Sequence, residues 1–212
     1  MGNISNYIEE FEMSLLSLDK QGADETLQKA ITNRSPIEVA GKLVAATLQK
    51  IGESWEQGRV ALSQIYMSGL ICEELIEKYI PAGSPVRISQ PKMAIAVFED
   101  YHLLGKRIVA STLRSAGYEL TDLGGGLSVD ELVEIIKREK YQILLLSVLM
   151  LNSAMHIKEL KEKLKDINVK IIVGGAPFRF DEELWIEVGA DGYGKDSSEA
   201  IEIVGKIMEG LA

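Results

Sequence analysis

The stretch Val97–Gly105, with the sequence VFEDYHLLG, decides the fold and points to the site. It completes an apolar run from Met93 that has the character of a buried β-strand and stops at two acidic residues. A helical pattern begins directly after Gly105. We therefore expect Asp100 and His102 on a loop at the carboxyl end of a strand, which is where ligands bind in open α/β sheets.

The spacing of Asp100 and His102 suits a metal-binding imidazole. A neutral ring gives one nitrogen to a metal, while a carboxylate holds the other N–H and fixes the tautomer. The alternative is that a single histidine after a strand is an ordinary loop residue. These residues alone leave both readings open.

Composition narrows the class of protein. The chain has 212 residues, 46% of them hydrophobic, which allows one large domain or two small ones with a real core. Its formal charge of −9 argues against nucleic-acid partners and against an anionic membrane surface. No apolar run has membrane-spanning length, and the single Cys72 excludes an internal disulfide, so we expect a cytoplasmic protein.

Residues 1–90 show helical periodicity only. Helices are expected over residues 7–18, ended by Gly22, and over 24–31, 35–58 and 61–80. Short connections predict a small four-helix bundle, and residues 82–91 are the predicted linker to a second domain. Trp55, Leu62 and Ile65 are expected near one helix–helix corner, where core packing alone would explain them.

Residues 91–212 alternate strands with helices. Strands are expected over residues 92–98, 119–123, 143–147, 170–173 and 191–193, and helices over residues 105–116, 129–138, 153–164, 181–188 and 197–211. Five such units predict a flavodoxin-like or Rossmann-like doubly wound parallel sheet of α/β class. We favour the strand order 2-1-3-4-5, which puts the switch point between the first and third strands.

The loops at the carboxyl ends of these strands should be neighbours. They cover residues 99–104, 124–126, 147–152, 174–177 and 193–196, and the glycines in them allow close approach to something large. Ser153 belongs either to this site or only to a helix N-cap. We find no nucleophile-and-base pair and no phosphate-binding glycine motif, so the site is predicted to hold a ligand and to contain no catalytic residue.

Taken together, these motifs resemble the corrinoid (cobalamin)-binding proteins, which are the methyl carriers of anaerobic methyltransferase systems and the cobalamin-binding module of methionine synthase. Asp100–Gly105 resembles the family's Asp-x-His-x-x-Gly, Ser147-Val148-Leu149 its Ser-x-Leu, and Gly174-Gly175 its Gly-Gly. Gly189–Tyr193 resembles the Gly-Ala-Asp-Gly-Tyr of the carriers. The resemblance covers essentially the whole chain.

The resemblance implies a cofactor site. His102 would be the metal ligand, binding cobalt in place of the cofactor's own base, with Asp100 on its other nitrogen and Ser153 extending that relay. The displaced tail would lie between the first and third strands, and a helical cap, residues 1–90, would cover the methyl-bearing face. The implied cofactor-binding residues are Asp100, Tyr101, His102, Leu103, Leu104, Gly105, Ser147, Leu149, Ser153, Gly174, Gly175, Ala176, Tyr193 and Gly194, with Trp55, Leu62 and Ile65 from the cap.

The resemblance also implies a function. The chain would shuttle a methyl group between a substrate-specific methyltransferase and an acceptor methyltransferase directed to tetrahydrofolate or a thiol, and a reductive activator would restore the cofactor. It would be one subunit of such a system rather than a complete enzyme. A cobalamin-dependent sensor and an adenosylcobalamin mutase subunit are the rivals. The methyl donor stays open, and His156 is expected to be a solvated helix residue.

Overall fold

The computed structural model describes residues 4–32, 34, 36–80 and 90–211, and it divides into two compact units. The helical unit comprises Met1–Gln90 together with Ser111–Glu119. The sheet unit comprises Pro91–Ala110 together with Leu120–Ala212. The predicted linker, residues 82–91, lies outside the described residues except for its last two.

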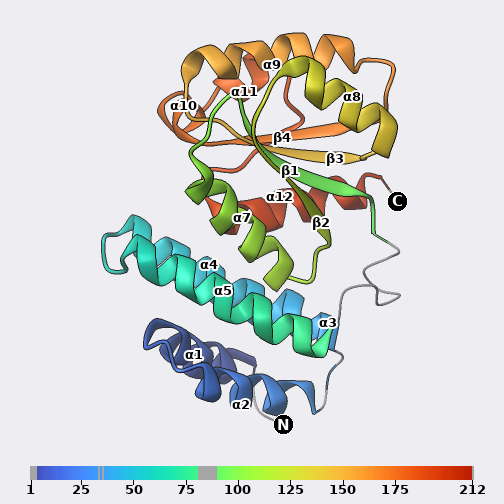
Figure 1. Ribbon diagram of the computed structural model, residues 1–212. Helices are drawn as coiled ribbons and strands as arrows, with labels where there is room; N and C mark the ends of the chain where they lie inside the picture. Colours follow the sequence, from blue (N-terminus) through green and yellow to red (C-terminus); the bar gives the residue numbers. More distant parts are fainter. Residues whose placement is uncertain (1–3, 33, 35, 81–89, 212) are drawn as a thin grey trace. The chain divides into compact units, whose positions relative to one another are not determined.

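The helical unit contains the helical segments that the periodicity predicts (Figure 1). They are α1 (Ile4–Leu16), α2 (Lys20–Ile31), a continuous run of α3 (Pro36–Val39), the π-helix η1 (Ala40–Val44) and α4 (Ala45–Glu56), and then α5 (Leu62–Tyr79). The break expected at Gly22 is wrong, because Gly22 lies inside α2. The chain turns at Leu18, where φ is 60°, and Asp19 then caps α2 by accepting the Gly22 N–H.

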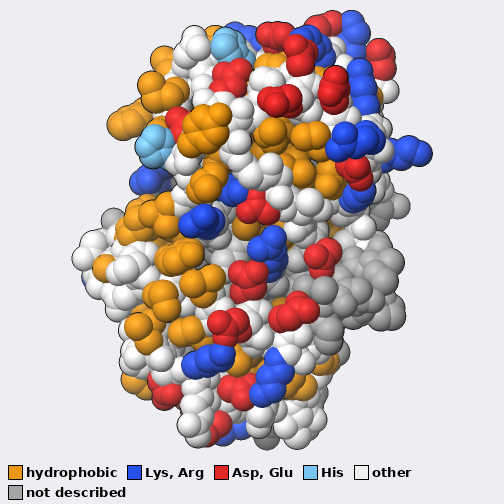
Figure 2. Space-filling view, in the orientation of Figure 1, with side chains coloured by type: hydrophobic (Ala, Val, Ile, Leu, Met, Phe, Trp, Pro, Cys, Tyr) orange, Lys and Arg blue, Asp and Glu red, His pale blue; other side chains and the backbone are white. Residues whose placement is uncertain are grey.

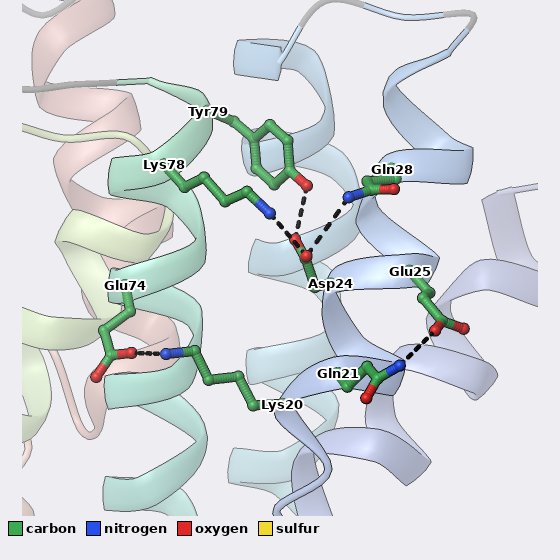
Figure 3. A network of polar contacts seen from close by, with 8 residues as sticks. All are labelled: Lys20, Gln21, Asp24, Glu25, Gln28, Glu74, Lys78 and Tyr79. Carbon is green, nitrogen blue, oxygen red and sulfur yellow. Dashed lines mark hydrogen bonds and ion pairs between the residues drawn. The ribbon is translucent and has the colours of Figure 1, made fainter.

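Polar contacts join α2 to α5 at the surface of the helical unit (Figure 3). The Asp24 carboxylate accepts hydrogen bonds from Lys78 Nζ at 2.7 Å and from the Tyr79 hydroxyl at 2.6 Å. Burial by itself would raise the pKa of Asp24, but these two donors lower it overall. Beneath them, α5 buries Cys72, and desolvation raises the pKa of its thiol, as expected for an inert core cysteine.

The sheet unit is built on five parallel strands in the predicted order β2-β1-β3-β4-β5. This confirms the predicted fold class. The strands are β1 (Met93–Phe98), β2 (Leu120–Leu127), β3 (Ile143–Ser147), β4 (Lys170–Gly174) and β5 (Gly192–Tyr193). Strand β1 is buried along its whole length, as expected for a central strand covered on both faces.

The helices of this unit leave the sheet on opposite faces (Figure 1). Helices α8 (Val129–Glu139) and α9 (Leu151–Lys163) lie on one face, and α7 (Leu103–Ser115) and α12 (Ser197–Glu209) lie on the other. Two short helices, α10 (Ala176–Phe180) and α11 (Leu184–Glu187), follow β4. Since α7 follows β1 and α9 follows β3, the chain diverges between these neighbouring strands. The switch point therefore lies between β1 and β3, as predicted.

Two local predictions are wrong for physical reasons. Strand β2 was expected to end at Leu123, but it continues through the three glycines to Leu127. Gly124 and Gly126 have φ values of 88° and 77°, so they bulge the strand and shift its register rather than end it. Ser153 is not an N-cap, since α9 begins at Leu151. Among the helices that the structure describes, none is both long and apolar enough to cross a membrane.

Candidate cofactor-binding site

The loop after β1 is fixed by backbone contacts to the end of β2. The Glu99 N–H donates to the Leu127 carbonyl at 3.1 Å, and the Gly126 N–H donates to the Asp100 carbonyl at 2.6 Å. A Cβ added to Gly126 would fall 2.4 Å from ring atoms of Tyr101. The Tyr101 ring therefore covers the backbone of Gly126, and the glycine-rich bulge of β2 supports this loop.

Asp100 holds the ring and the backbone of His102. One carboxylate oxygen, Oδ1, lies 2.5 Å from His102 Nδ1 and accepts the His102 backbone N–H at 2.7 Å. The bond to the His102 ring, and then the bond to its backbone, lower the pKa of Asp100. The carboxylate therefore stays ionised and favours the tautomer with its proton on Nδ1, which leaves the Nε2 lone pair available.

His102 presents this ring to the outside. Its side chain is 77% exposed, while that of Asp100 is 12% exposed. In the part of the chain that the structure describes, no side chain or backbone group hydrogen-bonds Nε2, and no three His, Cys, Asp or Glu residues gather where they could hold a metal ion. His102 is therefore suited to a metal that brings most of its ligands with it, as cobalt does in a corrin ring.

The second histidine lies on a helix with its side chain 42% exposed, in line with the expectation of a solvated helix residue, but it also has a partner. His156 lies on α9, and its Nδ1 is 2.8 Å from the Glu99 carboxylate, at the start of the same loop. Sequence reasoning missed both residues of this pair, because 57 positions separate them.

Small residues lie side by side at the switch point. A Cβ added to Gly105 would lie 3.7 Å from Ser147 Oγ, an ordinary van der Waals distance, so a methyl group would fit there and a larger side chain would meet the end of β3. Gly105 is exposed and Ser147 is half-buried, although the rest of β3 is buried. This is the place where the displaced tail of the cofactor was predicted to lie.

The glycines after β4 have a different environment. A Cβ on Gly174 would come within 2.9 Å of the Gly194 carbonyl oxygen, and one on Gly175 within 2.0 Å of the Val148 carbonyl oxygen. These two glycines allow the loops after β3, β4 and β5 to pack backbone against backbone. Ala176 follows them as the first residue of α10.

Two of the predicted polar residues, Ser153 and Tyr193, are buried, Ser153 as a whole and Tyr193 at its hydroxyl end. Ser153 is buried in the first turn of α9, and among the described residues its side chain makes no hydrogen bond to Asp100. Tyr193, at the end of β5, packs its ring against Phe178 with centroids 6.1 Å apart. Its buried hydroxyl has no hydrogen-bond partner in the described part of the chain, and burial raises its pKa.

Apolar side chains are exposed around His102. Figure 2 shows hydrophobic and histidine side chains together on the surface of the sheet unit. Leu103 is half-buried, and five large side chains are exposed in the loops after β1 and β3 and the first turns of the helices that follow: Tyr101, Leu104, Leu149, Met150 and Leu151. The last two were missed, although the apolar run after Ser147 is the signal that could have found them.

Trp55, Leu62 and Ile65 lie in the helical unit, on either side of the turn between α4 and α5. Ile65 is buried in the core, so packing explains it. Trp55 is half-buried, and Leu62 at the start of α5 is exposed.

The residues of the sheet unit fit a cobalamin. A single outward-facing imidazole could supply one nitrogen ligand, an exposed apolar rim suits a large flat macrocycle, and the small residues Gly105 and Ser147 keep bulky side chains away from the switch point. The residue types at this edge of the sheet therefore agree with a bound cobalamin.

Comparisons with known proteins point to the same cofactor. Two B12 binding domain families match the chain, one over residues 92–202 and the other over residues 7–79. A trimethylamine corrinoid protein of Methanosarcina barkeri is 31% identical, over 95% of this chain and 96% of its own length.

Two solved structures share the fold. A cobalamin-binding protein from Desulfitobacterium hafniense aligns with a TM-score of 0.77 at 22% identity, covering 97% of this chain and 98% of that one. A chain of the methanol:cobalamin methyltransferase complex from Methanosarcina barkeri aligns with a TM-score of 0.63 at 23% identity, covering 97% of this chain and 80% of that one. Since one B12 binding domain spans more than half of the chain and the corrinoid relative nearly all of it, the chain belongs to the corrinoid proteins, the cobalamin-binding methyl carriers of methyltransferase systems.

Proposed function

We propose that this chain binds cobalamin with His102 as the lower axial ligand, in place of the cofactor's own base, and presents a methyl group in turn to two methyltransferases. The observation that carries the proposal is the imidazole of His102, exposed at the carboxyl end of β1 with Nδ1 held by Asp100. When bound, cobalamin would supply a cobalt centre able to accept and release a methyl group.

The residues around His102 would tune that ligand. The Asp100 carboxylate accepts the Nδ1 proton and makes Nε2 a better donor. When the lower ligand is released, the proton that Nε2 gains would be stabilised by the same carboxylate. Ser153 would extend this relay if its hydroxyl turned toward Asp100, a role that rests on the family resemblance.

The tail of the cofactor would lie at the switch point. Gly105 and Ser147 would border it, since both are small and a side chain larger than a methyl group at position 105 would meet Ser147. Leu149 and the exposed apolar side chains around it would cover the edge of the macrocycle and exclude water.

Residues 1–90, the larger part of the helical unit, are proposed to act as a cap. By resemblance, Trp55, Leu62 and Ile65 would cover the methyl-bearing face and move aside during transfer. Cobalamin should then quench the fluorescence of Trp55, measured in a Trp185→Phe variant that leaves one tryptophan. Unchanged Trp55 fluorescence on saturation with cobalamin would contradict the cap.

The partners are proposed from the relatives. The trimethylamine corrinoid relative supports a methylamine methyltransferase as the donor enzyme to test first, with methanol second. The acceptor enzyme would be directed to tetrahydrofolate or a thiol, and a reductive activator would rescue oxidised cofactor. The cytoplasmic location predicted from composition stays a prediction.

The test is methyl transfer by the loaded protein. The reduced, cobalamin-loaded chain is mixed with each donor methyltransferase and its substrate, and methylation is followed in the visible spectrum. We expect one donor system to methylate the wild type and His102→Ala to bind cobalamin with its base off and react at least tenfold more slowly, because loss of the ligand removes its tuning. Equal spectra and rates for the two proteins would refute the ligand assignment.

A further inference from the structure

Glu99 has a backbone conformation that favours glycine. Among the described residues, three other than glycine have positive φ: Leu18, Lys140 and Glu99. Leu18 and Lys140 follow the ends of α1 and α8, where a left-handed residue is common. Glu99, with φ of 50°, joins a buried strand directly to the His102 loop, so its conformation has no helix end to explain it.

The side chain of Glu99 is tied to another element. Its Oε2 lies 2.8 Å from His156 Nδ1, and the two side chains are 24% and 42% exposed. His156 is on the second turn of α9, whose buried residues Ala154 and Ile157 anchor it in the core. The contact therefore joins the strained turn after β1 to a rigid helix.

This contact spans the switch point. The chain leaves β1 toward α7 and leaves β3 toward α9, on opposite faces of the sheet. The contact between Glu99 and His156 therefore links the segment that leaves β1 to the helix that follows β3. The turn that it fixes carries Asp100 and, two residues later, His102.

We propose that Glu99 and His156 form a positioning clamp that holds the loop in the conformation presenting His102. His156 stabilises a left-handed turn that a residue with a side chain otherwise disfavours, and it thereby sets the direction in which the Asp100–His102 pair points. Both are positioning residues and do not touch cobalt. The inference deepens the proposed function and rests on it, because its purpose is the presentation of the His102 ligand.

The first test uses the protein without cofactor. Hydrogen exchange is measured at the Gly126 amide, which bonds the Asp100 carbonyl. The variants His156→Ala and Glu99→Ala keep a residue with a side chain in the left-handed turn at position 99, but they lose the Glu99–His156 contact. Each should lower the protection of the Gly126 amide by roughly two- to tenfold, the range that one net hydrogen bond supplies. Glu99→Gly removes the carboxylate and also the backbone strain, because glycine adopts a positive φ readily. It should therefore keep wild-type protection.

The decisive comparison is a double-mutant cycle. In the Glu99→Gly background, His156→Ala should cost nothing further, because there is no strained turn left to hold. Lys158→Ala is the matched control. Lys158 is on α9, like His156, and its loss breaks a 2.7 Å contact with Glu187 that does not involve the His102 loop, so the loop should be unchanged. If His156→Ala lowers protection equally in both backgrounds, it acts through α9 alone and the clamp is refuted.

The second test measures ligation. In protein loaded with methylcobalamin, the visible spectrum reports the fraction with a nitrogen lower ligand, and His156→Ala should weaken this ligation by roughly two- to tenfold, with recovery in the Glu99→Gly double variant. Full ligation in His156→Ala would overturn the clamp and leave the proposed function standing. A wild-type spectrum identical to that of His102→Ala would overturn the proposed function and the clamp with it.

Discussion

The carboxyl edge of the sheet has an open side and a packed side, and both are made with glycine. On the open side, between β1 and β3, a Cβ at Gly105 would meet Ser147 Oγ at 3.7 Å and nothing closer. On the packed side, between β3, β4 and β5, a Cβ at Gly174 or Gly175 would strike backbone oxygens at 2.9 and 2.0 Å. The glycines of the predicted motifs therefore have two different roles: Gly105 keeps a side chain away from the proposed ligand site, and Gly174 and Gly175 allow loops to pack backbone against backbone.

The difference separates folding from binding. Gly175 is required so that the loops can pack against each other, whereas Gly105 is exposed and could carry a methyl group without a clash. Substitutions on the packed side should lower stability, and substitutions on the open side should lower cobalamin affinity.

Gly175→Ala should destabilise the protein most. Its φ of 119° and ψ of −175° lie in a region that only glycine enters readily, and the new methyl group would overlap the Val148 carbonyl. We expect a loss of more than about 3 kcal/mol in the free energy of unfolding, measured by urea denaturation. Gly194→Ala, whose Cβ would meet no atom closer than 3.5 Å, is the control and should stay near wild type. Similar stabilities for the two variants would contradict the claim that backbone packing at Gly175 requires glycine.

Gly105→Leu should affect the cofactor and spare the fold. The position is exposed in the first turn of α7, where leucine is a better helix former than glycine. A leucine side chain beside Ser147 would occupy the proposed tail site, and such overpacking costs about 1–3 kcal/mol, or roughly ten- to hundredfold in cobalamin affinity. Titration by tryptophan fluorescence or absorbance measures it, and Gly210→Leu is the matched control. Unaltered affinity in Gly105→Leu would place the tail elsewhere.

Asp191→Asn should have the smallest effect on stability, and it lies away from the carboxyl edge, because Asp191 precedes β5 and bonds the start of β4. Burial raises the pKa of Asp191, but the Ile171 N–H at 2.8 Å and the Lys161 ammonium at 2.6 Å lower it overall from its ordinary 3.8. The folded carboxylate thus holds its proton less tightly than the unfolded one, so its stabilisation is complete above pH 3.8 and declines as the pH falls through the folded-state value.

At pH 7 we expect the asparagine variant to lose about 1 kcal/mol, which is about 2–4 °C in melting temperature. The gap between the two proteins should narrow as the pH falls below 3.8. A gap that stays constant down to the lowest pH at which both proteins fold would show that the charge of Asp191 contributes nothing.

Much of this structure could be predicted from local pattern. The buried run Met93–Phe98, the alternation of strands and helices, and the position of Asp100 and His102 at a strand end follow from periodicity and from the geometry of parallel sheets. These features are encoded within about ten neighbouring residues, so a single sequence contains them.

The rest depends on contacts that the sequence does not show. That Gly124–Gly126 bulges β2, rather than ending it, depends on backbone partners in the loop after β1. That Gly175 packs against Val148, and that His156 meets Glu99, depends on which residues the fold brings together across distant parts of the chain. Residue type alone cannot distinguish a glycine that borders a ligand site from one that allows two backbone segments to pack together.

The central claim is that His102 binds cobalt, and one spectrum tests it directly. The protein is prepared with 15N-labelled histidine, loaded with cobalamin and reduced to the paramagnetic Co(II) state for electron paramagnetic resonance. If His102 is the lower ligand, the nitrogen superhyperfine lines change from triplets to doublets on labelling, in the wild type and in His156→Ala but not in His102→Ala. Triplets that persist in the labelled wild type would show the cofactor's own base on cobalt and contradict the account.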